Sequence, residues 1–189
     1  MKYTLKFRLW HWLNAVVVLG LLGTVFLRKT FLSWRTNSEI LTDKLFDMDI
    51  EITTLQAKTL AKAIRAGMWE WHIILGYALA FLMIYRTILY FKDSSIKEKF
   101  SELSLHKKGV KSLYYLVYAT LFFMSISGFI IYFYQDLGLS KATAHDIKDI
   151  HELVFNILLY FVPLHLVGLL IAEHRNEKGV VSRMINGRD

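Results

Sequence analysis

Histidine is the residue type in this chain whose positions most directly indicate chemistry. Three of the seven histidines fall in predicted loops or at a helix end, where an exposed imidazole needs no special explanation. The other four lie within long apolar stretches, where ionisable side chains are rare and usually functional, so together they predict a bound group. The first set is His106, His145 and His174, and the second is His11, His72, His151 and His165.

The four histidines of the second set fall at two predicted depths. Because successive apolar stretches run in opposite directions, His72 and His151 lie near one end of the bundle, and His11 and His165 lie toward the other. The fourteen residues from His151 to His165 span about 21 Å and turn through about 1400°, so both rings project from one helix face. Two facing pairs, His72/His151 and His11/His165, would suit two bis-histidine haems.

A zinc ion is the main alternative for such histidines. A tetrahedral zinc site needs three or four ligands at one level. Glu70 and Glu152 lie near the outer pair, so a zinc site there stays open, but the inner pair has no carboxylate within the apolar stretches. Gly76 and Gly168 lie close to two of the histidines and would let a flat macrocycle approach the backbone, although glycine also serves helix packing.

The segments that must position these histidines are long enough to cross a membrane. Four apolar stretches reach the required length of about 20 residues. Period-two alternation is absent and open strands cannot span lipid, so we expect helices. The first stretch lacks a small-x-small cleavage site and is predicted to be retained. The sequence predicts an all-α integral membrane four-helix bundle, one domain over 1–189, with spans at 9–27, 69–91, 113–134 and 150–172.

The distribution of basic residues predicts that both termini are cytoplasmic. The 92–111 loop, on the side of the termini, holds six lysines, whereas the short 135–149 loop on the other side holds only Lys141 and Lys148. Arg28 and Lys29 fit this orientation less well, because they directly follow the first span. The other basic residues on the side of the termini include Lys2, Lys6, Arg8, Arg175, Lys178, Arg183 and Arg188.

Composition excludes several kinds of site. The chain has no cysteine, which excludes cysteine-ligated iron–sulfur clusters, thiolate haem ligation, thiol catalysis, disulfides and covalent c-type haem attachment. The net charge of +7 is explained by cationic loops at an anionic lipid surface, and we expect no nucleic-acid partner.

The long outer loop, 28–67, is predicted to hold an amphipathic helix. Residues 39–51 are acidic, and residues 53–66 have helical periodicity. Either an interfacial helix on the outer leaflet or a docking surface for a partner protein would fit this pattern. The basic face of the helix carries Lys58, Lys62 and Arg65, and another face carries Leu60, Ile64 and alanines.

Several motifs resemble one known family. "LWHWLN" in the first span, "WEWHIILGY" and "IHELVFN" opening the second and fourth, and "PLHLVGLLIAEHRNEKGVVSRMING" near the end are similar to the bacterial cytochrome b561 and nickel–iron hydrogenase b-type cytochrome family. The resemblance implies a multi-pass protein of the bacterial inner membrane. It also implies two b haems, with ligands carried onto His11, His72, His151 and His165.

The chain departs from both branches of that family. The hydrogenase members usually have a further span, and the compact four-span members, some of which oxidise superoxide, have a shorter first outer loop. The resemblance therefore leaves the partner and the substrate of this chain open.

The expected function is electron transfer between the quinone/quinol pool and a membrane-associated or periplasmic redox partner. Bis-histidine ligation leaves no open iron position, which argues against oxygen binding. Whether the chain is an electron-transfer subunit or a quinone-linked oxidoreductase stays open. One alternative is a superoxide oxidase that passes electrons to quinone, with Lys58, Lys62 and Arg65 steering the anion. Another is a non-redox membrane anchor or metal-binding module.

Other polar residues have two interpretations each. Arg8 and basic residues of 28–67 could balance haem propionates or anchor the chain at the interface. Arg86 could reach an inner propionate or extend to the headgroups. Asn14 and Asn156 could belong to a quinone site or join helices. The tryptophans beside His11 and His72 are expected to form interfacial belts; they are Trp10, Trp12, Trp69 and Trp71.

Overall fold

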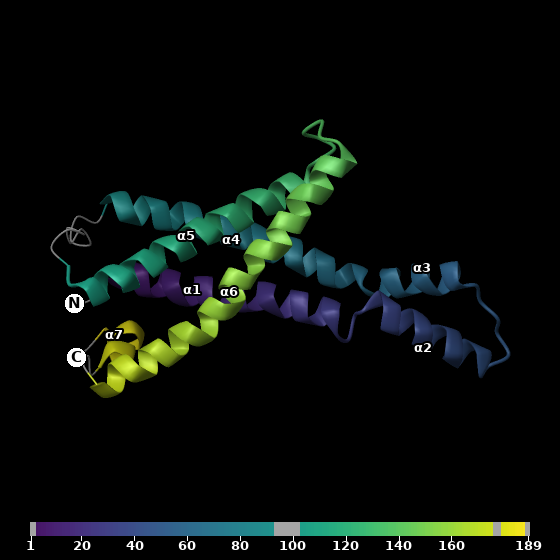
Figure 1. The fold of residues 1–189 in the computed structure, drawn as a ribbon, viewed down its shortest axis with the longest axis horizontal. Coiled ribbons are helices and arrows are strands. Elements are labelled where there is room, and N and C mark those ends of the chain that lie inside the picture. Colours follow the sequence, from purple (N-terminus) through teal and green to yellow (C-terminus); the bar gives the residue numbers. More distant parts are fainter. Residues whose placement is uncertain (1–2, 93–102, 176–178, 188–189) are drawn as a thin grey trace. The chain divides into compact units, whose positions relative to one another are not determined.

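The computed structural model describes residues 3–92, 103–175 and 179–187, and every regular element in these ranges is a helix (Figure 1). Four helices are long and apolar enough to cross a membrane, which confirms the predicted all-α fold. Three shorter helices complete the described part. The long helices are α1 (Leu5–Lys29), α4 (Ala66–Lys92), α5 (Leu105–Tyr132) and α6 (Lys141–Arg175); the short ones are α2 (Trp34–Phe46), α3 (Thr54–Ile64) and α7 (Val180–Ile185).

The long helices extend beyond the apolar stretches from which they were predicted. The largest difference is in α6, where the predicted span 150–172 lies inside a 35-residue helix. That helix is about 52 Å long, which exceeds the hydrocarbon thickness of about 30 Å. Hydropathy marks the part of a helix that lies in lipid, whereas backbone hydrogen bonding continues into polar residues. The two measures therefore give different ends.

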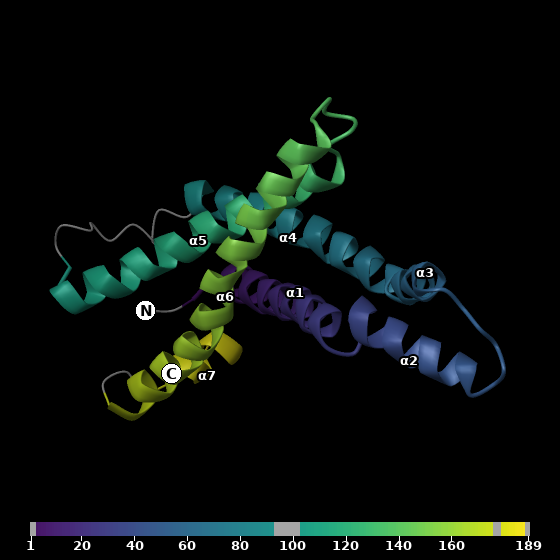
Figure 2. The same ribbon diagram turned by 45° about the vertical axis from the view of Figure 1, so that its right-hand side comes forward.

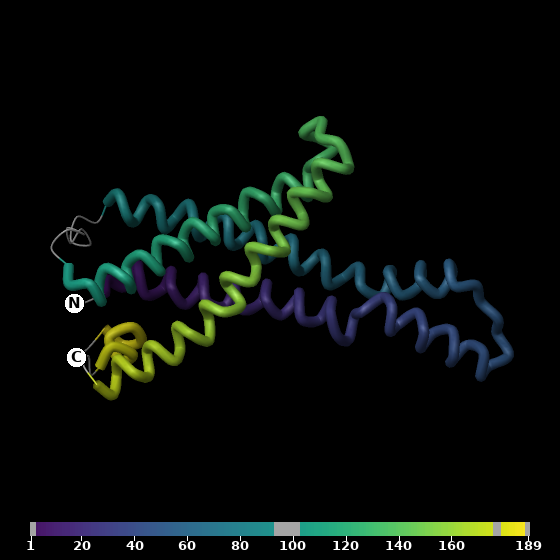
Figure 3. Tube along the Cα trace, viewed as in Figure 1, coloured from purple at the N-terminus to yellow at the C-terminus, as the bar shows by residue number. Residues whose placement is uncertain are grey.

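The described residues form two compact units, Met1–Asn14 with Leu79–Asp189, and Ala15–Ala78. In the first unit, α5 packs against α6, and Figure 3 shows that the two helices run antiparallel to each other. The buried side chains of this unit include Trp10, Met83, Leu121, Phe155 and Leu158. Many other large apolar side chains point away from the protein, for example Phe81 and Tyr160. This arrangement suits helices whose outer faces contact lipid.

In the second unit, α1 and α4 approach each other closely at a glycine. A Cβ atom added to Gly20 would lie 2.9 Å from Cδ1 of Leu75. Small residues at such positions let membrane helices approach closely enough for strong packing. Val18 and Leu22, also on α1, are buried in the same unit. The close approach brings the end of α1 alongside the start of α4, where one of the four histidines lies.

The 28–67 loop forms a helical hairpin of α2 and α3, which lie side by side in Figures 1 and 2. The predicted helix at 53–66 is confirmed as α3. It begins with a capping box in which Thr53 and Gln56 satisfy each other's backbone N–H groups. The buried face carries Ala57 and Ala61, which are 1% and 0% exposed.

The larger apolar side chains of α3 are not its packing face. Leu60 and Ile64 are 44% and 53% exposed, whereas the small alanines allow close approach to α2. The sequence does not indicate α2, because its acidic and polar residues obscure the helical periodicity. Lys58 also joins the two helices, since its Nζ lies 4.8 Å from the ring centre of Trp34. The predicted helix is therefore half of a helical hairpin, and its position relative to the membrane stays a prediction.

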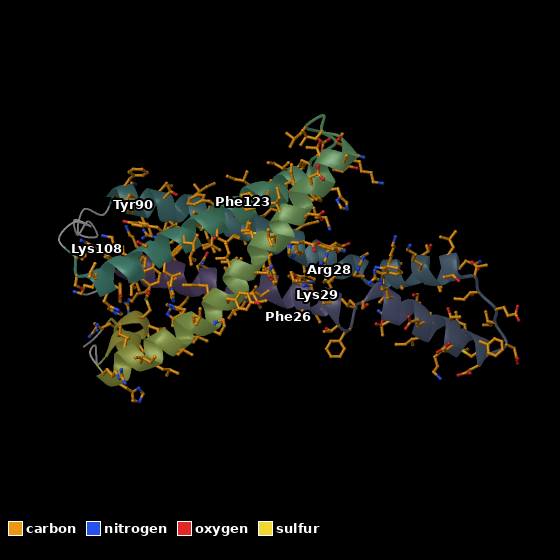
Figure 4. The ribbon with its side chains drawn as sticks, viewed as in Figure 1. Phe26, Arg28, Lys29, Tyr90, Lys108 and Phe123 are labelled. Atoms are coloured by element: carbon orange, nitrogen blue, oxygen red, sulfur yellow. The ribbon has the colours of Figure 1, made fainter. Side chains whose placement is uncertain are left out.

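The sidedness of the termini stays a prediction. Part of the basic 92–111 loop, residues 93–102, lies outside the described residues, as do Lys2, Lys178 and Arg188. Arg28 and Lys29, labelled in Figure 4, occupy the last turn of α1. Cations are favoured there by the negative end of the helix dipole, which gives these two residues a local structural reason.

Candidate functional site

The predicted inner histidines lie opposite each other in the first unit. The ring centres of His11 on α1 and His165 on α6 are 6.3 Å apart, and the rings are inclined by 58°. Two imidazoles that bind one metal ion from opposite sides, each at about 2 Å, have ring centres about 6 Å apart. The observed separation therefore suits a single metal ion between the two rings.

Aromatic side chains fix the orientation of His165. Phe161, one helical turn earlier on α6, stacks on the imidazole at 5.3 Å. Tyr114 on α5 meets it edge-on at 6.3 Å. On the other side of the pair, Trp12 meets the His11 ring edge-on at 5.5 Å. These contacts restrict rotation of both rings and surround the pair with apolar groups.

His72 lies in the second unit, where a hydroxyl group of α1 holds its ring. Nδ1 of His72 is 2.7 Å from Oγ1 of Thr24. The same hydroxyl donates its proton to the carbonyl oxygen of Leu21 at 2.6 Å. A hydroxyl has only one proton, so Thr24 must accept a hydrogen bond from the Nδ1–H group. His72 is then the tautomer protonated on Nδ1, with the lone pair on Nε2. This is the tautomer that can bind a metal through Nε2.

His151 has the same arrangement in the first unit. Its Nδ1 is 2.8 Å from Oγ of Ser127 on α5, and that hydroxyl donates to the carbonyl oxygen of Phe123 at 2.6 Å. The imidazole again donates from Nδ1 and carries its lone pair on Nε2. A Cβ atom at Gly128 would lie 3.7 Å from Cε1 of His151, so the ring also approaches the backbone of α5.

The roles of these two hydroxyl groups are not indicated by the sequence alone. Serine and threonine in apolar helices commonly bond to a carbonyl three or four residues earlier, so Thr24 and Ser127 look unremarkable in the sequence. The one available signal was their placement in apolar stretches that also had to hold histidines. Both side chains are buried.

The depths of His151 and His165 agree with their contacts on α5. His151 contacts Ser127 and His165 contacts Tyr114, so the contact points are 13 residues apart on α5 and 14 apart on α6. Both rings thus reach α5, as expected if they project from one side of α6. His72 belongs to the other unit, and its pairing with His151 stays a prediction.

Arg86 on α4 is buried in the first unit and does not extend toward the headgroups. Its side chain is 8% exposed, and Cζ lies 5.1 to 5.4 Å from the ring centres of Phe7, Trp10 and Tyr118. Nε donates to the hydroxyl of Tyr118 at 3.3 Å. Nη1 is buried and has no hydrogen-bond partner. The headgroup alternative is therefore wrong, because the helix turns this guanidinium into the protein.

The C-terminal helix α7 lies against the start of α1. Side chains from other helices bond to both of its ends. Because Trp12 follows His11, this anchoring fixes α7 beside the inner pair, and Arg8 is engaged by α7. The bonds run from Gly179 and Val181 N–H to Glu173 (2.7 and 3.1 Å), from Arg8 to the Ile185 carbonyl (2.9 Å) and from Trp12 to the Met184 carbonyl (3.2 Å).

Two glycines and two asparagines that the sequence singled out lie in the long helices. No described atom lies within 4 Å of a Cβ built on Gly76 or Gly168. Asn156 donates to the carbonyl of Leu153 on its own helix, at 3.0 Å. Oδ1 of Asn14 is buried without a hydrogen-bond partner.

Neither unit by itself gathers the donor set of a zinc site among its described residues. Among the described residues, no three histidine or carboxylate side chains gather closely enough to hold a metal ion. Glu152, the carboxylate considered for an outer zinc site, forms an ion pair with Lys148 at 2.8 Å. An axial pair on a porphyrin needs only one imidazole from each side, since the porphyrin supplies the remaining ligands.

Near His72, aromatic and basic side chains form a short series in the second unit. Trp69 meets the His72 ring edge-on at 5.6 Å, and Cζ of Arg28 lies 5.9 Å from the centre of the Trp69 ring. Trp69 therefore packs against a histidine and a cation at once, in addition to any role at the membrane interface.

Comparison with known protein families gives a match over nearly the whole chain. The family described as prokaryotic cytochrome b561 matches residues 2–187. Comparisons with curated proteins and with solved structures give no match. The match covers all four long helices and all four histidines of the candidate site.

Proposed function

The chain belongs to the prokaryotic cytochrome b561 family and is therefore a multi-pass membrane b-type cytochrome of electron transfer; from this premise we propose that it holds two haems and connects the quinone pool with a redox partner. We also propose that it resides in the bacterial cytoplasmic membrane. The single observation that most strongly supports the proposal is the 6.3 Å separation of the His11 and His165 rings.

The proposed ligands are His11 with His165 and His72 with His151. Haem iron supplies one-electron chemistry when it is bound. The chain's own residues hold and orient the imidazoles, and the apolar helices exclude water. For the outer pair, support comes from the hydroxyl groups of Thr24 and Ser127, which hold each imidazole in the ligand tautomer.

Quinone is the proposed partner within the bilayer. The four long helices expose apolar faces, which is where a lipid-soluble carrier would approach them. The second partner is proposed to be a protein that docks on the α2–α3 hairpin. This hairpin exposes Phe46, Met48 and Leu55 at its far end, beside the acidic residues Asp47 and Asp49.

The test is a spectrum combined with a haem count. Protein purified with ample haem supply should give a reduced-minus-oxidised spectrum of b-type haem and about two haems per chain. Addition of a quinol should reduce the haems, and reduction should stop in His11→Ala. Protein that contains one haem, or two haems that no quinol reduces, would contradict the corresponding half of the proposal.

A further inference from the structure

We propose that Arg86 forms a binding site for a carboxylate, and that this carboxylate is a propionate of the haem held between His11 and His165. The inference rests on the proposed function, because it requires a haem at the inner pair. It goes further by assigning a residue to the acidic edge of that haem, which the axial ligands do not contact.

The Arg86 guanidinium has no counter-charge among the described residues. Arg86 is 92% buried by the protein, on a helix long and apolar enough to span a membrane. Among the described residues, no carboxylate forms an ion pair with it. Asp149 and Glu152 pair with neighbours on their own helix, and Glu173 accepts from the backbone of α7. A buried charge without a partner is strongly unfavourable, so a partner is expected from outside the chain.

The groups around Arg86 hold its guanidinium without neutralising its charge. The rings of Phe7, Trp10 and Tyr118 offer their faces to the cation, and the Tyr118 hydroxyl accepts one hydrogen bond from Nε. Nη1 is left with N–H groups that no described atom accepts. Arginine has a planar set of donors that suits a carboxylate, so this is the ligand class that the unused donors fit.

The residues that surround Arg86 are neighbours of the residues that form or contact the inner pair. Trp10 directly precedes His11, and Tyr118 lies one helical turn after Tyr114, which contacts His165. The Trp10 indole also donates to the carbonyl oxygen of Leu82, one turn before Arg86, at 2.8 Å. This bond fixes the register of α1 against α4. The cage around Arg86 is thus built from the same helical turns that hold the inner histidines.

The experiment compares Arg86→Gln, Arg86→Lys and the control Arg175→Gln in the haem-loaded protein. Arg175 is an exposed arginine in the last turn of α6. Redox titration should resolve two haems. Loss of a nearby positive charge disfavours the reduced form, so Arg86→Gln should lower one midpoint potential. The affected haem should be the one lost in His165→Ala, Arg86→Lys should shift it less, and Arg175→Gln should leave both unchanged.

Esterified haem separates a propionate from a lipid phosphate. If Arg86 binds a propionate, Arg86→Gln should weaken binding of normal haem clearly but of haem dimethyl ester little, as in a double-mutant cycle. The same comparison is made in nanodiscs that contain different amounts of phosphatidylglycerol. If the effect of Arg86→Gln on haem binding depends on the phosphatidylglycerol content and not on esterification of the haem, the anion is a lipid phosphate and our assignment is wrong.

Two further outcomes complete the test. Arg86→Gln with normal haem content and both potentials unchanged would overturn the inference, while two haems in the unaltered protein would still support the proposed function. If Arg86→Gln does not accumulate, Tyr118→Phe takes its place, because it keeps the ring and removes only the acceptor for Nε. The inner potential should then shift with haem content intact; an unchanged potential would overturn the inference.

Discussion

Oγ of Ser127 lies 2.8 Å from Nδ1 of His151 and donates its own proton to a backbone carbonyl. The imidazole therefore has its Nδ1 proton fixed by α5 before any metal binds. Thr24 does the same for His72 from α1. Thr24 and Ser127, on two other helices, thus determine the tautomers of the two proposed outer ligands, which connects the proposed ligand chemistry to helix packing.

Ser127→Ala should weaken haem binding at the outer site by about 10–100-fold, the usual effect of losing a group that orients a ligand. It should also raise the midpoint potential of the outer haem, because the imidazole becomes a weaker electron donor. Haem titration and redox potentiometry measure the two effects. Ser125→Ala is a matched control, since Ser125 is also buried on α5 but bonds only to the carbonyl of Leu121. Equal shifts in both variants would contradict the role of Ser127.

His165→Ala should remove one of two haems, because the inner site would have one ligand. The measurement is the haem-to-protein ratio, together with the loss of one step in the redox titration. His106→Ala, which changes a histidine at the start of α5, serves as the control and should keep both haems. Retention of both haems in His165→Ala would show that the inner ligand lies elsewhere.

Gly20→Leu should destabilise the protein by about 1–3 kcal/mol, the usual cost of inserting methylene groups into a packed region. The cause is the close approach of α1 to Leu75 on α4. Gly23→Leu is the control, because no described atom lies within 4 Å of a Cβ at that position of the same helix. Thermal unfolding in detergent, followed by haem absorbance, compares the two. An equal loss of stability in both variants would argue against close packing at Gly20.

Ala61→Leu should open the α2–α3 hairpin, since Ala61 is fully buried in it and the added atoms have no space. We expect faster proteolysis between residues 34 and 64, slower electron exchange with a protein partner and unchanged haem content. Ala63→Leu adds the same atoms at an exposed position of α3 and should behave like the unaltered chain. Normal exchange by an opened hairpin would remove the proposed docking role.

The spans and the inner histidine pair were predictable from the sequence, because both follow from rules that act along one helix. Apolar length indicates a span, and residue spacing with alternating helix direction places His11 near His165. The helix ends were less predictable, as the polar start of α6 shows, since hydropathy does not detect a helix that continues into water.

What the sequence did not reveal depends on contacts between helices. The role of Thr24 becomes visible only when α1 lies against α4, and the burial of Arg86 requires aromatic residues from α1 and α5. The hairpin partner of α3 was missed for a related reason. Its packing face consists of alanines, which contribute little to an amphipathic pattern, while the larger apolar residues face outward.

The inner pair also has a consequence for biogenesis. His11 and His165 are 154 positions apart, so the ribosome must synthesise the chain through His165 before the second ring reaches the first. Until α6 has inserted, the N-terminal segment holds an imidazole in the bilayer without its opposite ligand. With His11 and His165 as the proposed ligands, haem capture at this level is a late event of membrane insertion, and chains truncated before α6 should lack this haem.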